Sequence, residues 1–190
     1  MARGNPTNIA LGPGKLYVAP LLTPIPADLD VAWDAGWTAL GYTIEGNTQT
    51  YAPSYDDVDV AEELDVIDSV PTGREITVAF GLAEMTARNL KLAMNGGTVV
   101  FTAAAGGKKA FTTFTPPALG QELYTMIGFE AEDGLERIAW KQCKQTGSVE
   151  TTRRKGADKA AIPCEFRVFT PADASVPFIR RSGRGTDGAA

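Results

Sequence analysis

The chain has 190 residues, of which 44% are hydrophobic and 22% charged, and its formal net charge at pH 7 is −5. This length suits one domain with a sizeable core, and the composition excludes a broadly disordered chain. The acidic balance argues against a whole-chain nucleic-acid binder, which would normally be basic. No apolar run is long enough to span a membrane, and the N-terminus lacks the apolar core of a secretory signal, so we expect a cytosolic origin.

Residue types that carry catalysis or bind cofactors are scarce. The chain has no histidine, which excludes Ser-His and Cys-His nucleophiles. Its two cysteines, Cys143 and Cys164, are too few for a structural zinc site, and we expect free thiols in a reducing cytosol. The glycine patterns of phosphate-binding and dinucleotide-binding loops are missing. We therefore predict a protein that is not an enzyme and has no catalytic, cofactor-binding or metal-binding residues.

The first part of the chain indicates an arm followed by strands. Residues 1–13 contain two glycines and two prolines and predict an N-terminal arm. Residues 15–20 predict a short strand, and residues 21–34 predict a long connection over the surface. Residues 37–51 are rich in Thr and Tyr, which favours a strand, with a bulge or turn at Glu45-Gly46-Asn47.

The segment 51–71 combines acidic and apolar side chains and contains no base. A solvated loop is one interpretation, and a calcium loop is a second, although the EF-hand order of ligands is missing. Because apolar residues are interleaved with the acids, we favour a third interpretation, an extended loop that docks on another subunit. The acids are Asp56, Asp57, Asp59, Glu62, Glu63, Asp65 and Asp68, and the apolar residues are Val58, Val60, Leu64, Val66 and Ile67.

A strand that runs directly into a helix follows this segment. Apolar residues alternate with other residues over 75–82, which is typical of a strand with one buried face. The period then changes, and Ala83, Ala87, Leu90 and Met94 form one stripe of a helix over 83–95. A single helix with such a stripe is expected to pack against a sheet.

Two hairpins are predicted after the helix. Residues 98–103 and 110–114 flank a Gly-Gly-Lys-Lys turn. Residues 123–131 and 135–142 flank Asp133-Gly134, and Asp-Gly between two alternating runs is a strong hairpin signal.

The remaining residues complete a single domain over 14–170. Residues 148–154 predict the start of a further strand, and 161–169 predict the last strand. Pro163 cannot donate a hydrogen bond to a neighbouring strand, so this strand is expected at an edge or bulged. Residues 171–190 are polar and glycine-rich and predict a C-terminal arm.

Two segments of opposite charge suggest contacts between copies of the chain. The acidic segment 56–68 is complemented by a basic segment over 137–159. Repetition of a contact between unlike surfaces gives rings or filaments. The predicted inter-subunit residues are Asp56, Asp57, Val58, Asp59, Val60, Glu62, Glu63, Leu64 and Asp65 on the acidic side and Arg153, Arg154, Lys155 and Lys159 on the basic side.

Four stretches carry a resemblance to a known family. They are GPGKLYVAPLLTPIP, WTALGYTIEGNTQTY, AEELDVIDSVPTGREITVAFGLAEMTARNLKLAMNGG and GLERIAWKQCKQTGSVETTRRKGADKAAIPCEFRVF. On these stretches the chain resembles the major tail tube proteins of long non-contractile-tailed (siphovirus-type) bacteriophages, specifically the actinobacteriophage group.

The resemblance implies a mainly β fold, a tail-tube-type β-sandwich or barrel with a single flanking helix. It implies six copies per ring and rings stacked around a tape-measure protein, in a tube that later conducts DNA without binding it specifically. It also implies tail terminator and distal tail proteins as partners, no membrane, no cofactor, and a place in the virion tail after assembly in the host bacterial cytoplasm. The lumen of such a conduit is expected to carry more acid than base.

Two other interpretations of the sequence stay open. One is a different ring or tube component on the same fold, such as a tube terminator, a baseplate ring or a secretion tube. The other is a monomeric β-sandwich that binds glycans or proteins. A glycan-binding module presents exposed aromatics, whereas Trp33, Trp37 and Trp140 are expected in core or interface packing.

Overall fold

The computed structural model describes residues 6–10, 12–62, 64–151 and 160–185. Within these ranges the protein is 47% strand and 5% helical, with a single α-helix, which confirms the predicted fold class. The elements are η1 (Pro6–Asn8), β1 (Gly14–Ala19), β2 (Thr38–Ala39), β3 (Thr43–Val58), β4 (Asp68–Leu82), α1 (Ala87–Ala93), β5 (Thr98–Thr102), β6 (Phe111–Thr115), β7 (Thr125–Ala131), β8 (Glu136–Gln145), β9 (Ile162–Val168) and β10 (Phe178–Ser182).

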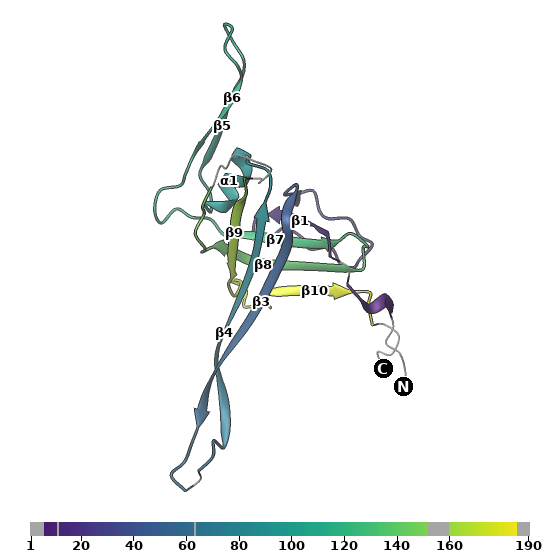
Figure 1. The fold of residues 1–190 in the computed structure, drawn as a ribbon, viewed down its shortest axis with the longest axis vertical. Coiled ribbons are helices and arrows are strands. Elements are labelled where there is room, and N and C mark those ends of the chain that lie inside the picture. The colour runs from purple at the N-terminus through teal and green to yellow at the C-terminus, as the bar shows by residue number, and fades with distance from the viewer. Residues whose placement is uncertain (1–5, 11, 63, 152–159, 186–190) are drawn as a thin grey trace.

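Eight strands form one antiparallel sheet in the order β2-β1-β7-β8-β9-β4-β3, with β10 beside β8. Two strands share one edge of β8: β10 pairs with residues 136–140, and β9 pairs with residues 143–145. In Figure 1, β7, β8 and β10 run across the view, whereas β3, β4 and β9 run along its long axis. The sheet therefore turns at the junction of β8 and β9 into two layers that cross.

The core lies between these two layers. Strand β9 alternates buried and exposed residues along its whole length, as expected for a strand with one buried face. The largest fully buried side chains are Trp140, Phe166, Leu82, Ile127, Ile162, Val78 and Cys143, from β4, β7, β8 and β9. Burial of each large apolar side chain contributes roughly 1.5–3 kcal/mol. The predicted strand over 75–82 and the Asp-Gly hairpin between β7 and β8 are both confirmed.

Helix α1 is shorter than the predicted helix over 83–95. Ala83 N donates to Tyr42 O at 2.9 Å, so the chain just after β4 is still bonded to the β3 side. Thr86 caps the helix by accepting a hydrogen bond from Asn89 N at 3.2 Å. The buried residues Leu92 and Ala93 attach the helix to the core.

The last strands correct two predictions. Strand β9 is not an edge strand, because it lies between β8 and β4. Pro163 pairs with Gly81 of β4, but the pairing with β8 extends only as far as Phe166, so the proline faces no β8 partner. The strand predicted over 148–154 is not observed at residues 148–151, and the rest of that range lies outside the described residues.

The C-terminal segment is partly built into the sheet. Residues 171–190 were expected to form an arm, yet β10 within them pairs with β8. Beyond β10, Gly185 N donates to the side-chain oxygen of Asn8 at 2.7 Å. The two ends of the described chain therefore lie together, on the side of the molecule where β10 ends (Figure 1).

Candidate assembly surfaces

The acidic segment belongs to a long ribbon made of the distal parts of β3 and β4, here called the β3–β4 arm (residues 51–75). The two strands pair from Tyr51 and Ile76 out to Val58 and Asp68. Every described residue of the arm is exposed, whereas the next residue, Ile76, is only 2% exposed. Figure 1 shows the arm projecting from the body. The prediction of an extended loop was therefore wrong in its local structure, because more than half of the segment is paired in a hairpin, with one register shift between Ser54 and Tyr55.

The β3–β4 arm presents a large apolar surface to solvent. Leu64 is fully exposed, and Tyr55 and Ile67 are each 56% exposed. A two-stranded ribbon with no third strand is marginally stable in water, and large exposed apolar patches mark interaction sites. The arm therefore has the properties of a surface that another molecule covers.

The predicted inter-subunit residues divide into two groups. Those described in the arm are Asp56, Asp57, Val58, Asp59, Val60, Glu62, Leu64 and Asp65, all exposed. Glu63, Arg153, Arg154, Lys155 and Lys159 lie outside the described residues.

The basic side chains of β8 are used within the subunit. Arg137 forms an ion pair with Glu130 at 2.6 Å, and Lys144 forms one with Glu122 at 3.5 Å. Lys141 Nζ donates to Ser175 Oγ at 2.9 Å. This described part of the expected basic segment therefore already has partners inside the same chain.

A second ribbon, the β5–β6 hairpin (residues 98–115), was predicted as a hairpin but not as a surface for contacts. Its strands are exposed except for Phe114, which is half-buried. Phe101 is 68% exposed and Phe111 55% exposed, and the only charged residues of the hairpin are Lys108 and Lys109 at its tip. Figure 1 shows it projecting from the end of the molecule opposite the β3–β4 arm. The apolar run Val99–Phe101 does not alternate, which is typical of a strand covered on both faces, yet in the single subunit both faces of this ribbon are exposed.

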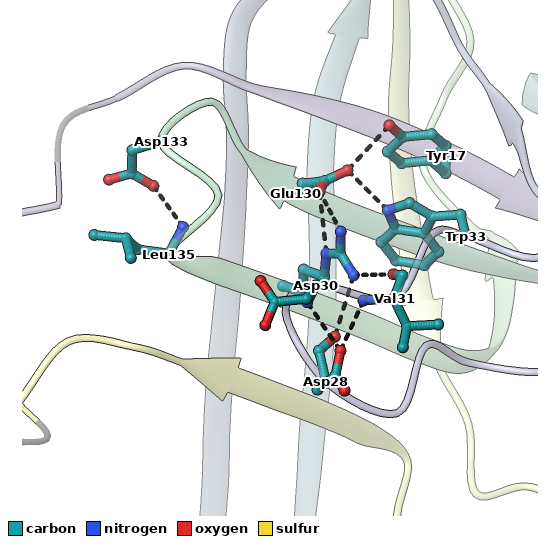
Figure 2. Close-up of polar contacts among 9 residues, drawn as sticks. Tyr17, Asp28, Asp30, Val31, Trp33, Glu130, Asp133 and Leu135 are labelled. Carbon is teal, nitrogen blue, oxygen red and sulfur yellow. Dashed lines mark hydrogen bonds and ion pairs between the residues drawn. The ribbon is translucent and has the colours of Figure 1, made fainter.

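The long connection over residues 21–36 is fastened to the sheet by one carboxylate, Glu130 of β7. Figure 2 shows Glu130 Oε2 accepting hydrogen bonds from the Tyr17 hydroxyl at 3.1 Å and the Trp33 indole at 2.9 Å. Arg137 binds the other oxygen and also donates to the backbone carbonyls of Asp28 and Val31. We call this cluster the Glu130 clamp. It holds the connection in place, and its polar groups form hydrogen bonds within the subunit.

The clamp predicts a loss of stability in acid. Burial raises the pKa of Glu130, but the hydrogen bonds from its partners and the charge of Arg137 outweigh burial and lower the pKa below its ordinary value. A carboxyl whose pKa is lowered by folding stabilises the fold above its unfolded pKa, and this contribution is lost as the pH falls through the folded value. We expect the melting temperature to be insensitive to this group above about pH 5 and to fall below it.

The measurement is the melting temperature across that range, for the wild type and for Glu130→Gln. The variant is expected to be less stable at neutral pH and to lose less stability on acidification. Glu132→Gln, which changes an exposed glutamate on the adjoining turn, is the matched control. Equal acid sensitivity of the wild type and Glu130→Gln would contradict a stabilising charge at this position.

The structure also describes the residues that concern metals, cysteines and membranes. Among the described residues, no group of three or more His, Cys, Asp or Glu side chains is arranged to hold a metal ion. Both cysteines are free, as predicted, and the structure shows that both are buried, which raises the pKa of Cys164 to about 12. No helix in the described part of the chain is long and apolar enough to cross a membrane.

The described residues form a β body with two exposed ribbons, the β3–β4 arm and the β5–β6 hairpin. The family model described as phage tail tube protein matches residues 1–176. The chain therefore belongs to the phage tail tube protein family and is a structural, self-assembling component of the virion tail. No curated protein matches it in a sequence comparison.

Proposed function

We propose that six copies of this tail tube protein close into a ring, that the rings stack into the tube of a long non-contractile tail, and that the tube conducts DNA during ejection. The phage is of the actinobacteriophage group, and assembly takes place in the cytoplasm of the host bacterium. The tube encloses a tape-measure protein and ends on tail terminator and distal tail proteins.

The observation that carries this proposal is the β3–β4 arm. All its described residues are exposed, and it bears tyrosine, valine, leucine and isoleucine. Its own subunit does not cover this apolar ribbon, and contact with a neighbouring copy explains why the apolar side chains are there. The described acids of the arm, together with Glu63 and the basic residues Arg153, Arg154, Lys155 and Lys159, are proposed as inter-subunit residues on grounds of charge complementarity.

The charge of the chain supports a conduit for DNA. Each lysine or arginine that contacts a phosphate adds affinity for the cargo, and this affinity would oppose its movement. A net charge of −5 suits a lumen that does not bind DNA. A lumen lined chiefly by lysine and arginine would contradict this part of the proposal.

Negative-stain electron microscopy of the purified protein, over a range of concentrations, tests the assembly. We expect rings and tubes whose end views have sixfold symmetry. Another rotational symmetry would contradict the hexamer, and monomers at every concentration would contradict self-assembly. Monomers that bind glycans would favour the binding-module interpretation instead.

A further inference from the structure

We infer that the β5–β6 hairpin receives the β3–β4 arm of a second copy of the chain, with Lys108 and Lys109 against the acids of that arm. This inference rests on the proposed function, because it identifies the surface that covers the arm. The contact joins unlike surfaces, so each copy offers one arm and one hairpin.

Charge complementarity is the first argument. Between residues 56 and 68 the arm has no base, and its described acids are Asp56, Asp57, Asp59, Glu62, Asp65 and Asp68. The β5–β6 hairpin has no acid, and both of its charges are exposed lysines. Neither lysine forms an ion pair with any residue that the structure describes. Opposite charges on two exposed ribbons steer the arm to the hairpin and disfavour contacts between two arms or two hairpins.

Apolar surface is the second argument, because exposed ion pairs alone contribute little. Phe101 pairs with Thr112 across the hairpin, and Phe111 pairs with Thr102, so the two phenylalanines lie on opposite faces of the ribbon. Both rings are more than half exposed. On the arm, Tyr55 and Leu64 offer apolar surface of the same kind. A contact between the ribbons would remove from water the apolar side chains that each subunit leaves uncovered.

Geometry is the third argument. The two ribbons leave opposite ends of the subunit, along its longest axis (Figure 1). An arm cannot reach the hairpin of its own subunit in this arrangement, whereas a copy displaced along the axis presents its hairpin to that arm. A contact of this kind joins two unlike surfaces and repeats from copy to copy.

A charge exchange tests the inference. K108E/K109E and D57K/D59K are each expected to raise the protein concentration required for assembly by more than about tenfold, because the first sets two glutamates against the acids of the arm and the second sets two lysines against Lys108 and Lys109. An equimolar mixture of the two variants is expected to assemble, because the unchanged arm of one meets the unchanged lysines of the other, and the two lysines introduced into the other arm meet the two introduced glutamates. Sedimentation and electron microscopy measure assembly, and circular dichroism checks that each variant is folded.

The control for K108E/K109E is K15E/K91E, which makes the same change in net charge at two other exposed lysines. It is expected to assemble at nearly the wild-type concentration. If K108E/K109E assembled like this control, or if the mixture failed to assemble, the inference would be wrong. The proposed function would still stand as long as the wild type forms rings and tubes.

Disulfide trapping tests the contact without depending on polymers. Asp59→Cys and Lys109→Cys are made separately, and Cys143 and Cys164 do not interfere because they are at most 3% exposed. Under mild oxidation the mixture is expected to give a cross-linked dimer that neither variant gives alone. A chain with both substitutions is expected to give a ladder of oligomers. Dimers from either single variant in the same yield as from the mixture would overturn the pairing.

Discussion

Replacing residues 56–68 by Asn-Gly is expected to give a folded protein that no longer forms tubes. The removed residues contribute nothing to the core, since those that the structure describes are all exposed. Asn-Gly favours a tight turn, and Ser69 and Val70, whose partners are removed, complete the connection to the remaining Tyr55–Pro71 pair. The melting temperature is expected to stay within a few degrees of the wild type, while sedimentable polymer disappears. Polymers of normal yield would show that the β3–β4 arm has no role in assembly.

A single substitution tests whether assembly depends on the apolar side chains of the arm, since it leaves the length of the arm unchanged. Leu64→Asp adds a charge at the tip of the arm, where the side chain is fully exposed. Leu119→Asp makes the same change at a leucine that is 98% exposed in the loop after β6. We expect the first substitution to weaken assembly and the second to leave it unchanged, with neither altering the melting temperature. Equal effects of the two substitutions would point to charge alone.

Trp140→Ala is expected to have the largest effect on stability. Trp140 is 0% exposed, pairs with Ile127 of β7 and Phe178 of β10, and lies in the core between the two layers of the sheet. Truncation of a buried tryptophan costs roughly 3–5 kcal/mol, which is a large part of the 5–15 kcal/mol by which a typical protein is stable. At about 2–4 °C per kcal/mol, the melting temperature is expected to fall by roughly 6–20 °C.

Trp140→Phe is the matched control for this prediction. The indole Nε1 is buried and forms no hydrogen bond to any described residue, so its loss removes no such bond. A phenyl ring keeps much of the apolar volume, and we expect clearly less than half of the loss seen for alanine. Thermal denaturation of both variants measures the difference. Equal losses for the two variants would contradict a stabilisation that grows with the apolar volume packed at this position.

Local patterns in the sequence predicted most of the strands. Alternation over 75–82 predicted the buried half of β4, because one face of that strand packs on the core. The Asp133-Gly134 turn predicted the β7–β8 hairpin for a similar reason, since the turn and both strands are adjacent in the sequence. The helix was predicted too long, because an apolar stripe does not reveal the hydrogen bond by which Ala83 stays attached to Tyr42.

The features that depend on distant residues or on exposure were missed. The shared edge of β8 depends on two strands that follow it in the chain, and no local pattern encodes such a choice of partners. The β3–β4 arm has no buried face, so its strands lack the alternation that signals a strand. Charge pattern alone singled out its acids. It also singled out bases of β8 that turned out to be paired internally, whereas the exposed bases at Lys108 and Lys109 were overlooked.

The contact between Asn8 and Gly185 has a practical consequence for the tube. Because a hydrogen bond joins these two residues, a peptide attached next to Asn8 and a peptide attached next to Gly185 leave the subunit at the same place. In a tube of repeated copies, such fusions would be displayed in a regular array with one attachment point per subunit. A short linker across the same gap would also allow a circular permutant, with new chain ends opened elsewhere in the subunit.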